Sequence, residues 1–382
     1  MRFVYFSSIA GTLDSGVSKK IQQQVSELIK LNIDAQIILI CGSKVPTTIN
    51  SYVKFYKSKY LDNSNILNKI RRQFLKRMIL NELISFLGEN DIVYLRSFDP
   101  MFYFVSPNRN KLCKIVSEHN SIEHLEYKST GNYLNLFLEL ALGKYALNHI
   151  DAIVGVTDEI TEFELSRADD SNKPHITIGN GIDVSSFKLR NPISFSGDEL
   201  QLICVASISR WHALDRLLNG LALYRGYAKV KLHIVGDGKE LKNLQAIAKN
   251  HGFDDKVSFH GFMSGNALDK LFDSCHIAIG SLGIHRKGLR MTSELKIREY
   301  TARGIPFICG TIDPDFPYDF PYVHKVPSDE SPIDIEDIIS FVKSVYLDSD
   351  HHIKMRIFAE NNLDWSIKME RLKEFCEALI SE

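Results

Sequence analysis

Apolar residues in the first part of the chain come in short runs, separated by stretches with a helical period. The runs have the length and composition of buried strands and are bounded by polar or turn-forming residues. They are residues 2–9, 35–41, 92–97, 114–120 and 151–157. The segment after the first run predicts a helix, because one stripe of it carries Val17, Ile21, Val25, Leu28 and Ile29. Strands that alternate with helices predict a parallel sheet with helices on both faces.

A second alternating series follows a segment of different composition. Residues 170–198 are rich in Ser, Asn, Asp, Pro and Gly, which indicates a junction between domains. Beyond it the predicted strands are residues 200–208, 230–236, 256–261, 276–282 and 305–310. The predicted helices between them are residues 213–225, 239–252, 265–275 and 293–304. We therefore expect a second doubly wound α/β domain, and a length of 382 residues suits two domains.

Composition and charge narrow the functional class. Hydrophobic residues make up 44% of the chain and charged residues 24%, which is typical of a globular protein with ample core. A net charge of -1 and the lack of a nucleic-acid signature argue against a nucleic-acid partner. The six cysteines are scattered without C-x-x-C spacing. Cys204, Cys275 and Cys309 lie in or beside apolar runs and are expected to be small core residues, which fits a reducing cytoplasm. The start of the chain does not resemble a secretory signal. The longest apolar stretch, residues 133–147, includes Glu139 and Lys144 and is too short to span a bilayer.

The segments that follow the strands of the second half are rich in glycine and basic residues. Ligands of such sheets bind beyond the carboxyl ends of the strands. The segments there are residues 207–212, 236–238, 261–262 and 281–287. Glycine lets backbone amides approach a ligand, and basic side chains offset phosphate charge. Together with the amides of a helix that starts near Ser293, they predict a site for a nucleoside diphosphate.

The helix predicted from Ser293 to Gly304 carries polar residues at helical spacing. Ser293 is expected to cap its start, and Gly304 with Pro306 to end it. The polar positions are Lys296, Glu299, Tyr300 and Arg303. Such a face meets either water or a polar ligand. Lys296 and Glu299 would form an ordinary surface pair in the first case, and Glu299 would accept hydrogen bonds from ribose hydroxyls in the second.

Three further motifs have competing interpretations. Gly236-Asp237-Gly238 follows a strand, but Leu241 stands where a dinucleotide fingerprint needs Gly or Ala, which leaves a phosphate loop or a tight turn. His119 ends a strand and is either structural or catalytic. The pair Asp313 and Asp315 has metal-ligand spacing, yet it lies in a Pro-rich loop and is better explained by turn formation.

A basic amphipathic pattern covers residues 66–83. Its apolar positions are Ile66, Ile70, Phe74 and Met78, and its basic ones Lys69, Arg71, Arg72, Lys76 and Arg77. Such a helix can lie on an anionic membrane. The alternative is a solvated helix that packs on the sheet, and both interpretations stay open at this point.

With these features in place, the chain resembles the family 4 glycosyltransferases, a retaining group that uses nucleotide sugars. The resemblance covers nearly the whole chain and rests on the order and spacing of several motifs. They are AGTLDSGVSKKI, IGNGIDVSSF, KLHIVGDG, VSFHGF and ELKIREYTARGIPFI. It implies the GT-B fold, in which two doubly wound Rossmann-like domains face each other across a cleft. The expected domains are an acceptor-side domain of residues 1–184, onto which a C-terminal helix of residues 366–382 packs back, and a donor-binding domain of residues 185–365.

The resemblance also implies roles for single residues. Glu299 matches the glutamate that binds the donor ribose, Gly16 the loop glycine against the donor phosphates, and His119 the histidine near the transferred sugar. Gly261 and Phe262 match the strand end whose backbone meets the base. The remaining expected donor contacts come from the glycine turn and the helix start, at Gly236, Ser293, Glu294, Leu295 and Lys296.

The sequence departs from the family pattern at three places. Met291 stands where the first glutamate of the pattern is expected. His212 stands where lysine is common, so that Arg210 alone remains of the usual phosphate-binding pair. Arg286 and Lys287 are expected to supply the missing charge, and with Arg210 they would stabilise the leaving diphosphate.

The expected function is therefore the transfer of a sugar, with retention of configuration, to a saccharide or lipid-linked saccharide in cell-surface polysaccharide synthesis. We expect no cofactor and no metal, because fixed positive groups take the metal's place. The protein is expected in the cytoplasm, with a peripheral contact to the inner membrane surface as an option. The alternatives are a nucleotide-sugar epimerase of the same architecture and a non-catalytic protein that binds nucleotide sugars.

Overall fold

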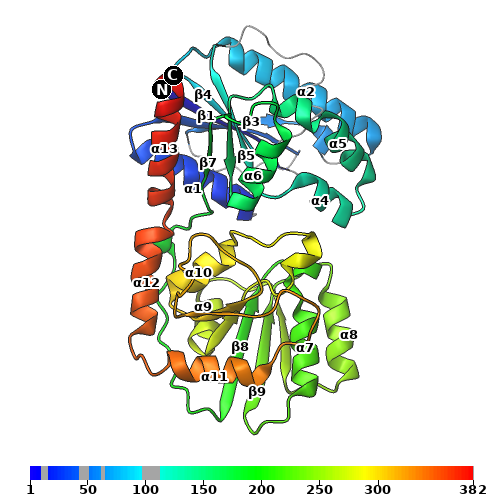
Figure 1. The fold of residues 1–382 in the computed structure, drawn as a ribbon, viewed down its shortest axis with the longest axis vertical. Helices are drawn as coiled ribbons and strands as arrows, with labels where there is room; N and C mark the ends of the chain where they lie inside the picture. The colour runs from blue at the N-terminus through cyan, green and yellow to red at the C-terminus, as the bar shows by residue number, and fades with distance from the viewer. Residues whose placement is uncertain (10–15, 43–50, 62–64, 97–111, 382) are drawn as a thin grey trace. The chain divides into compact units, whose positions relative to one another are not determined.

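The chain forms two compact units in the computed structural model, which describes residues 1–9, 16–42, 51–61, 65–96 and 112–381. Unit 1 consists of Met1–Gly179 and Trp365–Glu382, and unit 2 of Asn180–Asp364. The predicted boundary lay after residue 184, whereas the units divide after Gly179 (Figure 1). Each unit is an α/β structure built on its own parallel sheet.

The sheet of unit 1 has seven strands within the described residues, in the order β3-β2-β1-β4-β5-β6-β7, and all neighbours are parallel. They are β1 (Arg2–Ile9), β2 (Asp34–Cys41), β3 (Val53–Lys57), β4 (Ile92–Arg96), β5 (Lys114–His119), β6 (Ala152–Gly155) and β7 (His175–Thr177). The central strands are buried on both faces, which agrees with their continuous apolar runs.

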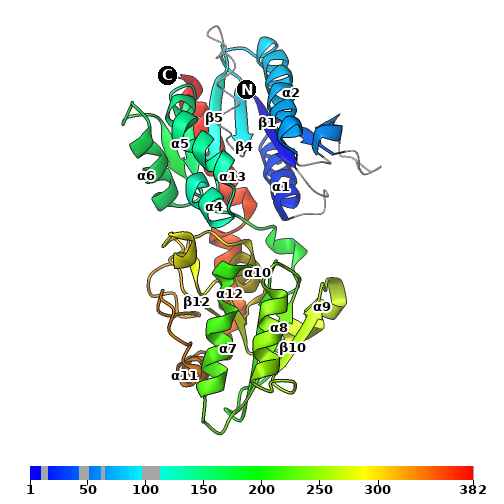
Figure 2. The ribbon, with the colours of Figure 1, turned by 90° about the vertical axis from the view of Figure 1, so that its right-hand side faces the viewer.

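Helices cover both faces of this sheet (Figures 1 and 2). They are α1 (Gly16–Lys30), α2 (Ile66–Ser85), α4 (Glu123–Ser129), α5 (Tyr133–Leu147), α6 (Asp158–Arg167) and α13 (Trp365–Ser381), with a short 3-10 turn η1 (Lys59–Leu61). On one face α1 and α13 share a core that includes Val25 and Trp365. On the other face α2 and α5 pack through residues such as Ile79 and Leu147.

The sheet of unit 2 is also parallel and has the order β10-β9-β8-β11-β12-β13. Its strands are β8 (Glu199–Val205), β9 (Lys229–Val235), β10 (Val257–Gly261), β11 (Ile277–Ile279), β12 (Phe307–Cys309) and β13 (Val323–Lys325). The strand order reverses at β8, which pairs with β9 on one side and β11 on the other. In open α/β sheets such a switch point is where ligands bind.

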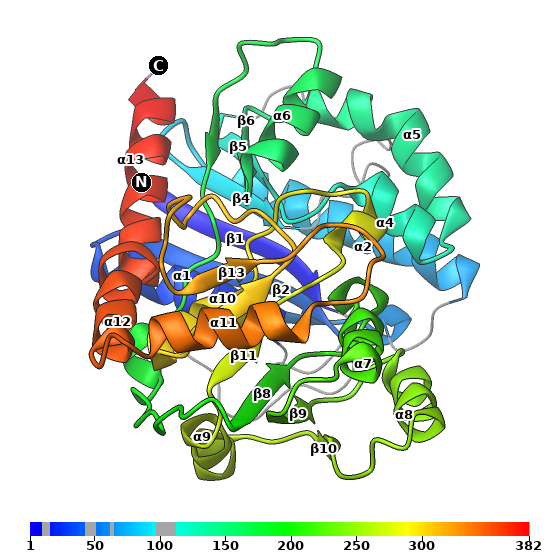
Figure 3. The same ribbon diagram turned by 60° about the horizontal axis from the view of Figure 1, so that its bottom comes forward.

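The helices of unit 2 also lie on both faces of its sheet. They are α7 (Leu214–Leu223), α8 (Leu241–Asn250), α9 (Gly265–Asp273), α10 (Leu295–Arg303), α11 (Ile335–Val345) and α12 (His351–Asn362), with 3-10 turns η2 (Val184–Ser186), η3 (Arg210–His212) and η4 (Ile284–Lys287). The neighbouring helices α7 and α8 pack beside each other on one face (Figures 2 and 3). The cores around α9, α10 and α12 form the other face.

Several expectations from sequence can be compared with this structure. The two parallel-sheet α/β units and nearly all predicted helices and strands are confirmed. The six cysteines are all buried. The apolar stripe of α1 is only partly buried, because Val17 and Ile29 are exposed. Among the described helices, none combines the length and apolar composition needed to cross a membrane.

Candidate functional site

Three segments meet around the switch point of unit 2. The chain leaves β8 into η3, leaves β11 into η4, and then enters α10. Tyr300 of α10 ties them together, because its hydroxyl accepts a hydrogen bond from Val205 N–H (3.1 Å) and donates one to Ile279 O (3.2 Å). Val205 ends β8 and Ile279 ends β11. The start of α10 is thus fixed at the carboxyl edge where the topology predicts a ligand.

Lys296 is the most unusual side chain at this edge. It lies in the first turn of α10 and is largely enclosed, with its Nζ 3.3 Å from Glu294 Oε2. Within the described residues, Nζ has no hydrogen-bond partner. An ammonium group can donate three hydrogen bonds, so an enclosed one with a single ion pair has capacity left for an anionic ligand.

His212 lies beside this lysine and cannot share its charge. Burial lowers the pKa of His212, and with the charges of Lys296 and Lys287 it brings this pKa to about 2. Ser209 N–H donates to His212 Nδ1 at 3.0 Å, so the ring proton of the neutral imidazole is on Nε2. His212 is therefore neutral, and the charges of two lysines, Lys296 and Lys287, act on its ring.

The two basic residues of η4 behave differently from each other. The guanidinium of Arg286 donates to both oxygens of Asp215 (2.9 and 2.8 Å) and also bonds Glu330. These carboxylates already balance its charge, which goes against the expectation that Arg286 supplies charge to a phosphate. Lys287 Nζ lies 4.4 Å from the ring centroid of Trp211, and the charge of Lys287 contributes to the low pKa of His212. Arg210 is exposed at the start of η3.

The start of α10 differs from its prediction. The helix begins at Leu295 with Glu294 as its N-cap, so the prediction that Ser293 caps it is wrong. Ser293 is buried, and its Oγ accepts a hydrogen bond from Asn180 N–H at 2.6 Å. Glu294 provides no side-chain cap either. The first amides of α10 therefore have no capping side chain, which suits an anion.

The polar face predicted for this helix is smaller than expected. Tyr300 and Arg303 are buried, which leaves Lys296 and Glu299 as its half-buried polar positions. Arg303 Nε donates to Glu299 Oε1 at 2.8 Å, and Arg303 also bonds Asp269 at 2.7 Å. This chain of contacts holds the Glu299 carboxylate in one orientation.

The predicted glycine contacts divide into two groups. A Cβ on Gly236 would lie 1.9 Å from Ala206 O, and φ is +118° there. Close packing of two loops thus explains this glycine without a ligand, in line with the tight-turn interpretation. Gly261 has open space around its Cβ position, and Phe262 next to it is exposed. Gly16 is the exposed first residue of α1, and the loop before it lies outside the described residues.

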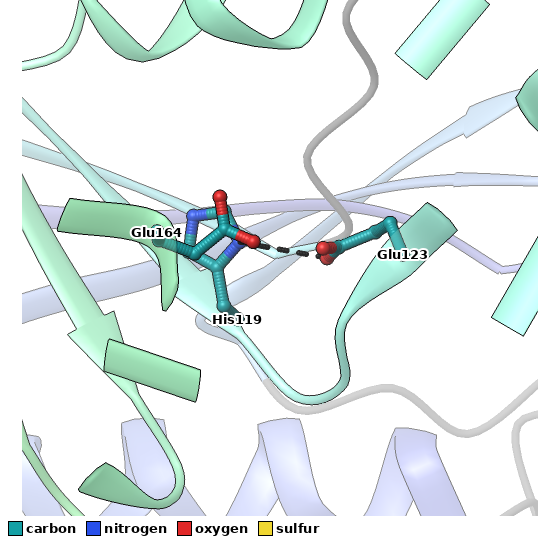
Figure 4. Close-up of side chains that lie close together, drawn as sticks. All are labelled: His119, Glu123 and Glu164. Atoms are coloured by element: carbon teal, nitrogen blue, oxygen red, sulfur yellow. Dashed lines mark ion pairs between the residues drawn. The ribbon is translucent and has the colours of Figure 1, made fainter. Parts of the chain in front are cut away.

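In unit 1, His119 ends β5 inside a cluster of carboxylates (Figure 4). Its Nδ1 lies 3.5 Å from Glu123 Oε1 and 3.7 Å from Glu164 Oε1, and its Nε2 lies 2.8 Å from Ser117 Oγ. The ring is fully buried, and both nitrogens face groups of unit 1. Burial favours the neutral ring, but Glu164 and Glu123 outweigh it and raise the pKa of His119 to about 9. A role near a transferred sugar stays a prediction for this residue.

The same three residues are a candidate cation site, because their ligand atoms lie within 4.8 Å of one another. Arg167, however, bonds Glu164 (3.1 Å) and Glu139, and it already supplies positive charge. The Asp313 and Asp315 pair is also accounted for, because the fully buried Arg298 bonds both carboxylates. Asp313 Oδ1 also accepts a hydrogen bond from Asp315 N–H at 3.2 Å, which agrees with turn formation, whereas the ion pairs with Arg298 were not predicted.

A second charged network in unit 1 was not anticipated from sequence. Glu118 accepts hydrogen bonds from Tyr5 (2.7 Å) and pairs with Lys20 (2.9 Å) and Arg96 (3.2 Å). Burial would raise the pKa of Glu118, but Lys20 and Arg96 hold it well below its usual range. Two cations therefore face one carboxylate beside the β1–β4 switch point. The one sequence signal was that Glu118 directly precedes His119 at the end of a strand.

Comparison with known proteins supports the family expectation for part of the chain. Residues 185–286 match the model of the family described as "Glycosyl transferases group 1". This stretch contains β8, η3, β9, β10 and β11. The protein named "Uncharacterized glycosyltransferase MJ1607", from Methanocaldococcus jannaschii, is 20% identical over 215 residues. The aligned part is 52% of this chain and 54% of that protein, so the chain spans about half the length of this relative.

Similarity to solved structures covers the whole chain and shows the fold. Sucrose-phosphate synthase (tll1590) from Thermosynechococcus elongatus has a TM-score of 0.73 and 13% identity over 100% of both chains. The apo form of the lipopolysaccharide outer core galactosyltransferase WaaB has a TM-score of 0.66 and 15% identity over 99% of both chains. Anabaena Alr3699/HepE, in complex with UDP and glucose, has a TM-score of 0.63 and 11% identity over 99% of this chain and 100% of its own. The fold is therefore that of the GT-B glycosyltransferases.

Proposed function

We propose that this chain is a retaining glycosyltransferase of family 4. It would move a sugar from a nucleoside-diphosphate sugar to a saccharide or lipid-linked saccharide acceptor in cell-surface polysaccharide synthesis. The observation that carries the proposal is the enclosed Lys296 at the switch point of unit 2, with donor capacity left for an anion. The family match of residues 185–286 and the GT-B fold support it. Three similar solved structures hold UDP, which makes UDP the first nucleotide to test.

The donor is proposed to bind along the carboxyl edge of unit 2. Lys296, Lys287 and Arg210, with the first amides of α10, would hold the diphosphate. Glu299, oriented by Arg303, would accept hydrogen bonds from the ribose hydroxyls. Glu294 lies beside Lys296 and follows Met291, the place of the missing pattern glutamate, by three residues. Gly261 and Phe262 would meet the base.

The proposed reaction replaces one bond at the anomeric carbon. The bond from this carbon to the diphosphate oxygen breaks while the acceptor hydroxyl oxygen bonds to the same face. The departing phosphate oxygen takes the hydroxyl proton, so no protein nucleophile is required. Negative charge grows on the diphosphate, where fixed cations stabilise the transition state more than the ground state. By this logic no metal is needed.

The test is donor turnover with sugar nucleotides of uracil, guanine, thymine and adenine, followed by release of the nucleoside diphosphate. Glu299→Gln should lower kcat/KM by at least about tenfold, because a ribose contact to a charged carboxylate is lost. The matched control is Glu360→Gln, which removes an exposed glutamate that also pairs with an arginine four residues away. Sugar isomerisation without transfer would indicate an epimerase, and binding without turnover a non-catalytic protein. If no sugar nucleotide binds at all, the proposal is wrong.

A further inference from the structure

Helix α2 turns apolar side chains outward. Leu67, Ile70, Phe74 and Met78 follow one another at spacings of three and four residues, and they are between 39% and 63% exposed. The helix packs on the sheet through another set, Ile79, Leu80 and Ile84. Three residues of the predicted apolar stripe, Ile70, Phe74 and Met78, are therefore exposed, and the structure does not use them to cover the sheet. The residues of α2 that do cover the sheet are in the C-terminal half of the helix.

Helix α5 repeats this arrangement. Tyr133, Leu134, Phe137 and Leu140 are between 44% and 71% exposed, while Ala146 and Leu147 are buried in the same core as the inner face of α2. Both helices lie on one face of the unit 1 sheet, which is on the right in Figure 1 and toward the viewer in Figure 2. In both helices the exposed apolar residues lie toward the N-terminal end, whereas the residues that are buried in the sheet core lie toward the C-terminal end.

Two rows of large apolar side chains on one face are not expected of a surface that meets only water. A helix on the surface of a globular protein normally turns its polar side outward, and clustered exposed apolar side chains mark a binding surface. The rows belong to separate helices, which suits a broad, flat partner better than a peptide in a groove.

The charge of α2 identifies the partner. Arg71, Arg72, Lys76 and Arg77 lie within its central turns, and the helix has no acidic residue before Glu82. Arg71 is exposed, and the other three are partly so. Basic side chains with long aliphatic stems, beside exposed aliphatic and aromatic residues, are the pattern that binds anionic lipid headgroups at a membrane surface.

We propose that the α2–α5 face of unit 1, formed by Leu67, Ile70, Phe74 and Met78 with Tyr133, Leu134, Phe137 and Leu140, docks on an anionic lipid bilayer. The apolar rows would enter the headgroup boundary, and Arg71 and Arg72 would pair with lipid phosphates. This inference stands without the proposed transferase activity. If both hold, unit 1 would present an acceptor carried by a lipid at the membrane surface.

The test measures binding of the full chain to vesicles of phosphatidylcholine with about one quarter phosphatidylglycerol, against pure phosphatidylcholine, by co-sedimentation at about 0.05 M and about 0.5 M salt. The wild type should bind the anionic vesicles, and this binding should weaken as the salt concentration rises. Phe74→Ser with Met78→Ser, and separately Phe137→Ser with Leu140→Ser, should each weaken partitioning by at least about tenfold. Arg71→Glu with Arg72→Glu should do the same at low salt and remove most of the salt dependence.

The control is Tyr318→Ser with Leu347→Ser, which removes two apolar side chains of unit 2 that are 92% and 89% exposed. These positions are exposed, except for the partly exposed Arg72, so the variants should fold, and equal thermal unfolding temperatures will check this. Binding that is absent, or that is the same for the α2, α5 and control variants, would overturn the proposal. Self-association that the α2 and α5 variants abolish, without vesicle binding, would also overturn it in favour of a second copy on this face.

Discussion

Lys296 Nζ lies 3.3 Å from Glu294 Oε2 in the first turn of α10, at the point where the strand order of unit 2 reverses. The ammonium group is largely enclosed and has no hydrogen-bond partner within the described part of the chain. The sequence comparison with family 4 pointed instead to Arg286 and Lys287 for the missing phosphate-binding charge. The structure therefore makes Lys296 of α10, and not a residue of η4, the strongest candidate for binding the phosphate.

Arg286 provides the contrasting prediction. Because Asp215 and Glu330 already hold its guanidinium, Arg286→Met should change nucleotide affinity by less than about threefold. The same change should lower the free energy of unfolding by about 1 kcal/mol, since these pairs are partly exposed. Calorimetric titration and urea unfolding of the variant measure both effects. A tenfold loss of nucleotide affinity would contradict this prediction and would mean that Arg286 binds the phosphate.

Alkaline pH should destabilise unit 1 through His119. Glu164 and Glu123 raise the pKa of His119 to about 9 in the folded protein, against about 6.5 when unfolded. The protonated ring therefore stabilises the fold fully below about pH 6.5, and this contribution is lost as the pH rises through about 9. Its size is on the order of 1–3 kcal/mol.

The measurement is the urea unfolding free energy of the chain between pH 6 and pH 9.5. Glu164→Gln removes one carboxylate that holds the charged ring, so the loss of stability with rising pH should become smaller in this variant. An equal slope in wild type and variant would contradict the assignment.

Acid should destabilise unit 2 through buried neutral histidines. Burial lowers the pKa of His212 to about 2 and that of His351 to about 4. A histidine with a lowered folded pKa stabilises the protein fully above about pH 6.5, and this stability is lost as the pH falls. At pH 5 each contributes a loss of up to about 2 kcal/mol. His351→Asn should flatten the decline of the unfolding free energy between pH 7 and pH 5, and an equal decline in wild type and variant would contradict this assignment.

Arg298 should be essential to the fold of unit 2 rather than to its chemistry. It is fully buried and bonds the carboxylates of Asp313 and Asp315. Arg298→Met removes the buried cation that both carboxylates bond and should cost about 3–5 kcal/mol of unfolding free energy. Arg356→Met, which removes a partly exposed arginine of α12, is the comparison and should cost about 1 kcal/mol. Similar losses in the two variants would mean that the buried pair is not what holds this loop.

Sequence patterns predicted the fold well because the central strands are continuous apolar runs. The strands that were missed, β3, β7 and β13, are short and largely exposed or half-exposed, so they lack such runs. Helix α2 shows a different limit. Its period revealed an apolar stripe but not which side of the helix would pack on the sheet.

The site was predictable only in outline, for a similar reason. Topology and glycine-rich segments pointed to the carboxyl edge of unit 2, and Glu299 and Lys296 do lie on α10 there. The neutralisation of Arg286 depends on Asp215 and Glu330, which are 71 and 44 residues away in sequence. Likewise, Tyr300 is polar in the pattern but is drawn into the core by hydrogen bonds to β8 and β11. Contacts of this range are set by packing and leave no local signal.

The most direct test of the central claim is calorimetric binding of UDP, GDP, dTDP and ADP to the wild type, Lys296→Met and Lys354→Met. Lys354 is an exposed lysine of unit 2 that also pairs with a carboxylate, so it controls for the loss of one charge. We predict that one nucleoside diphosphate binds the wild type and Lys354→Met alike, and that Lys296→Met weakens this binding by at least about tenfold. Equal affinity in all three proteins would contradict the claim that Lys296 holds a diphosphate at the switch point of unit 2.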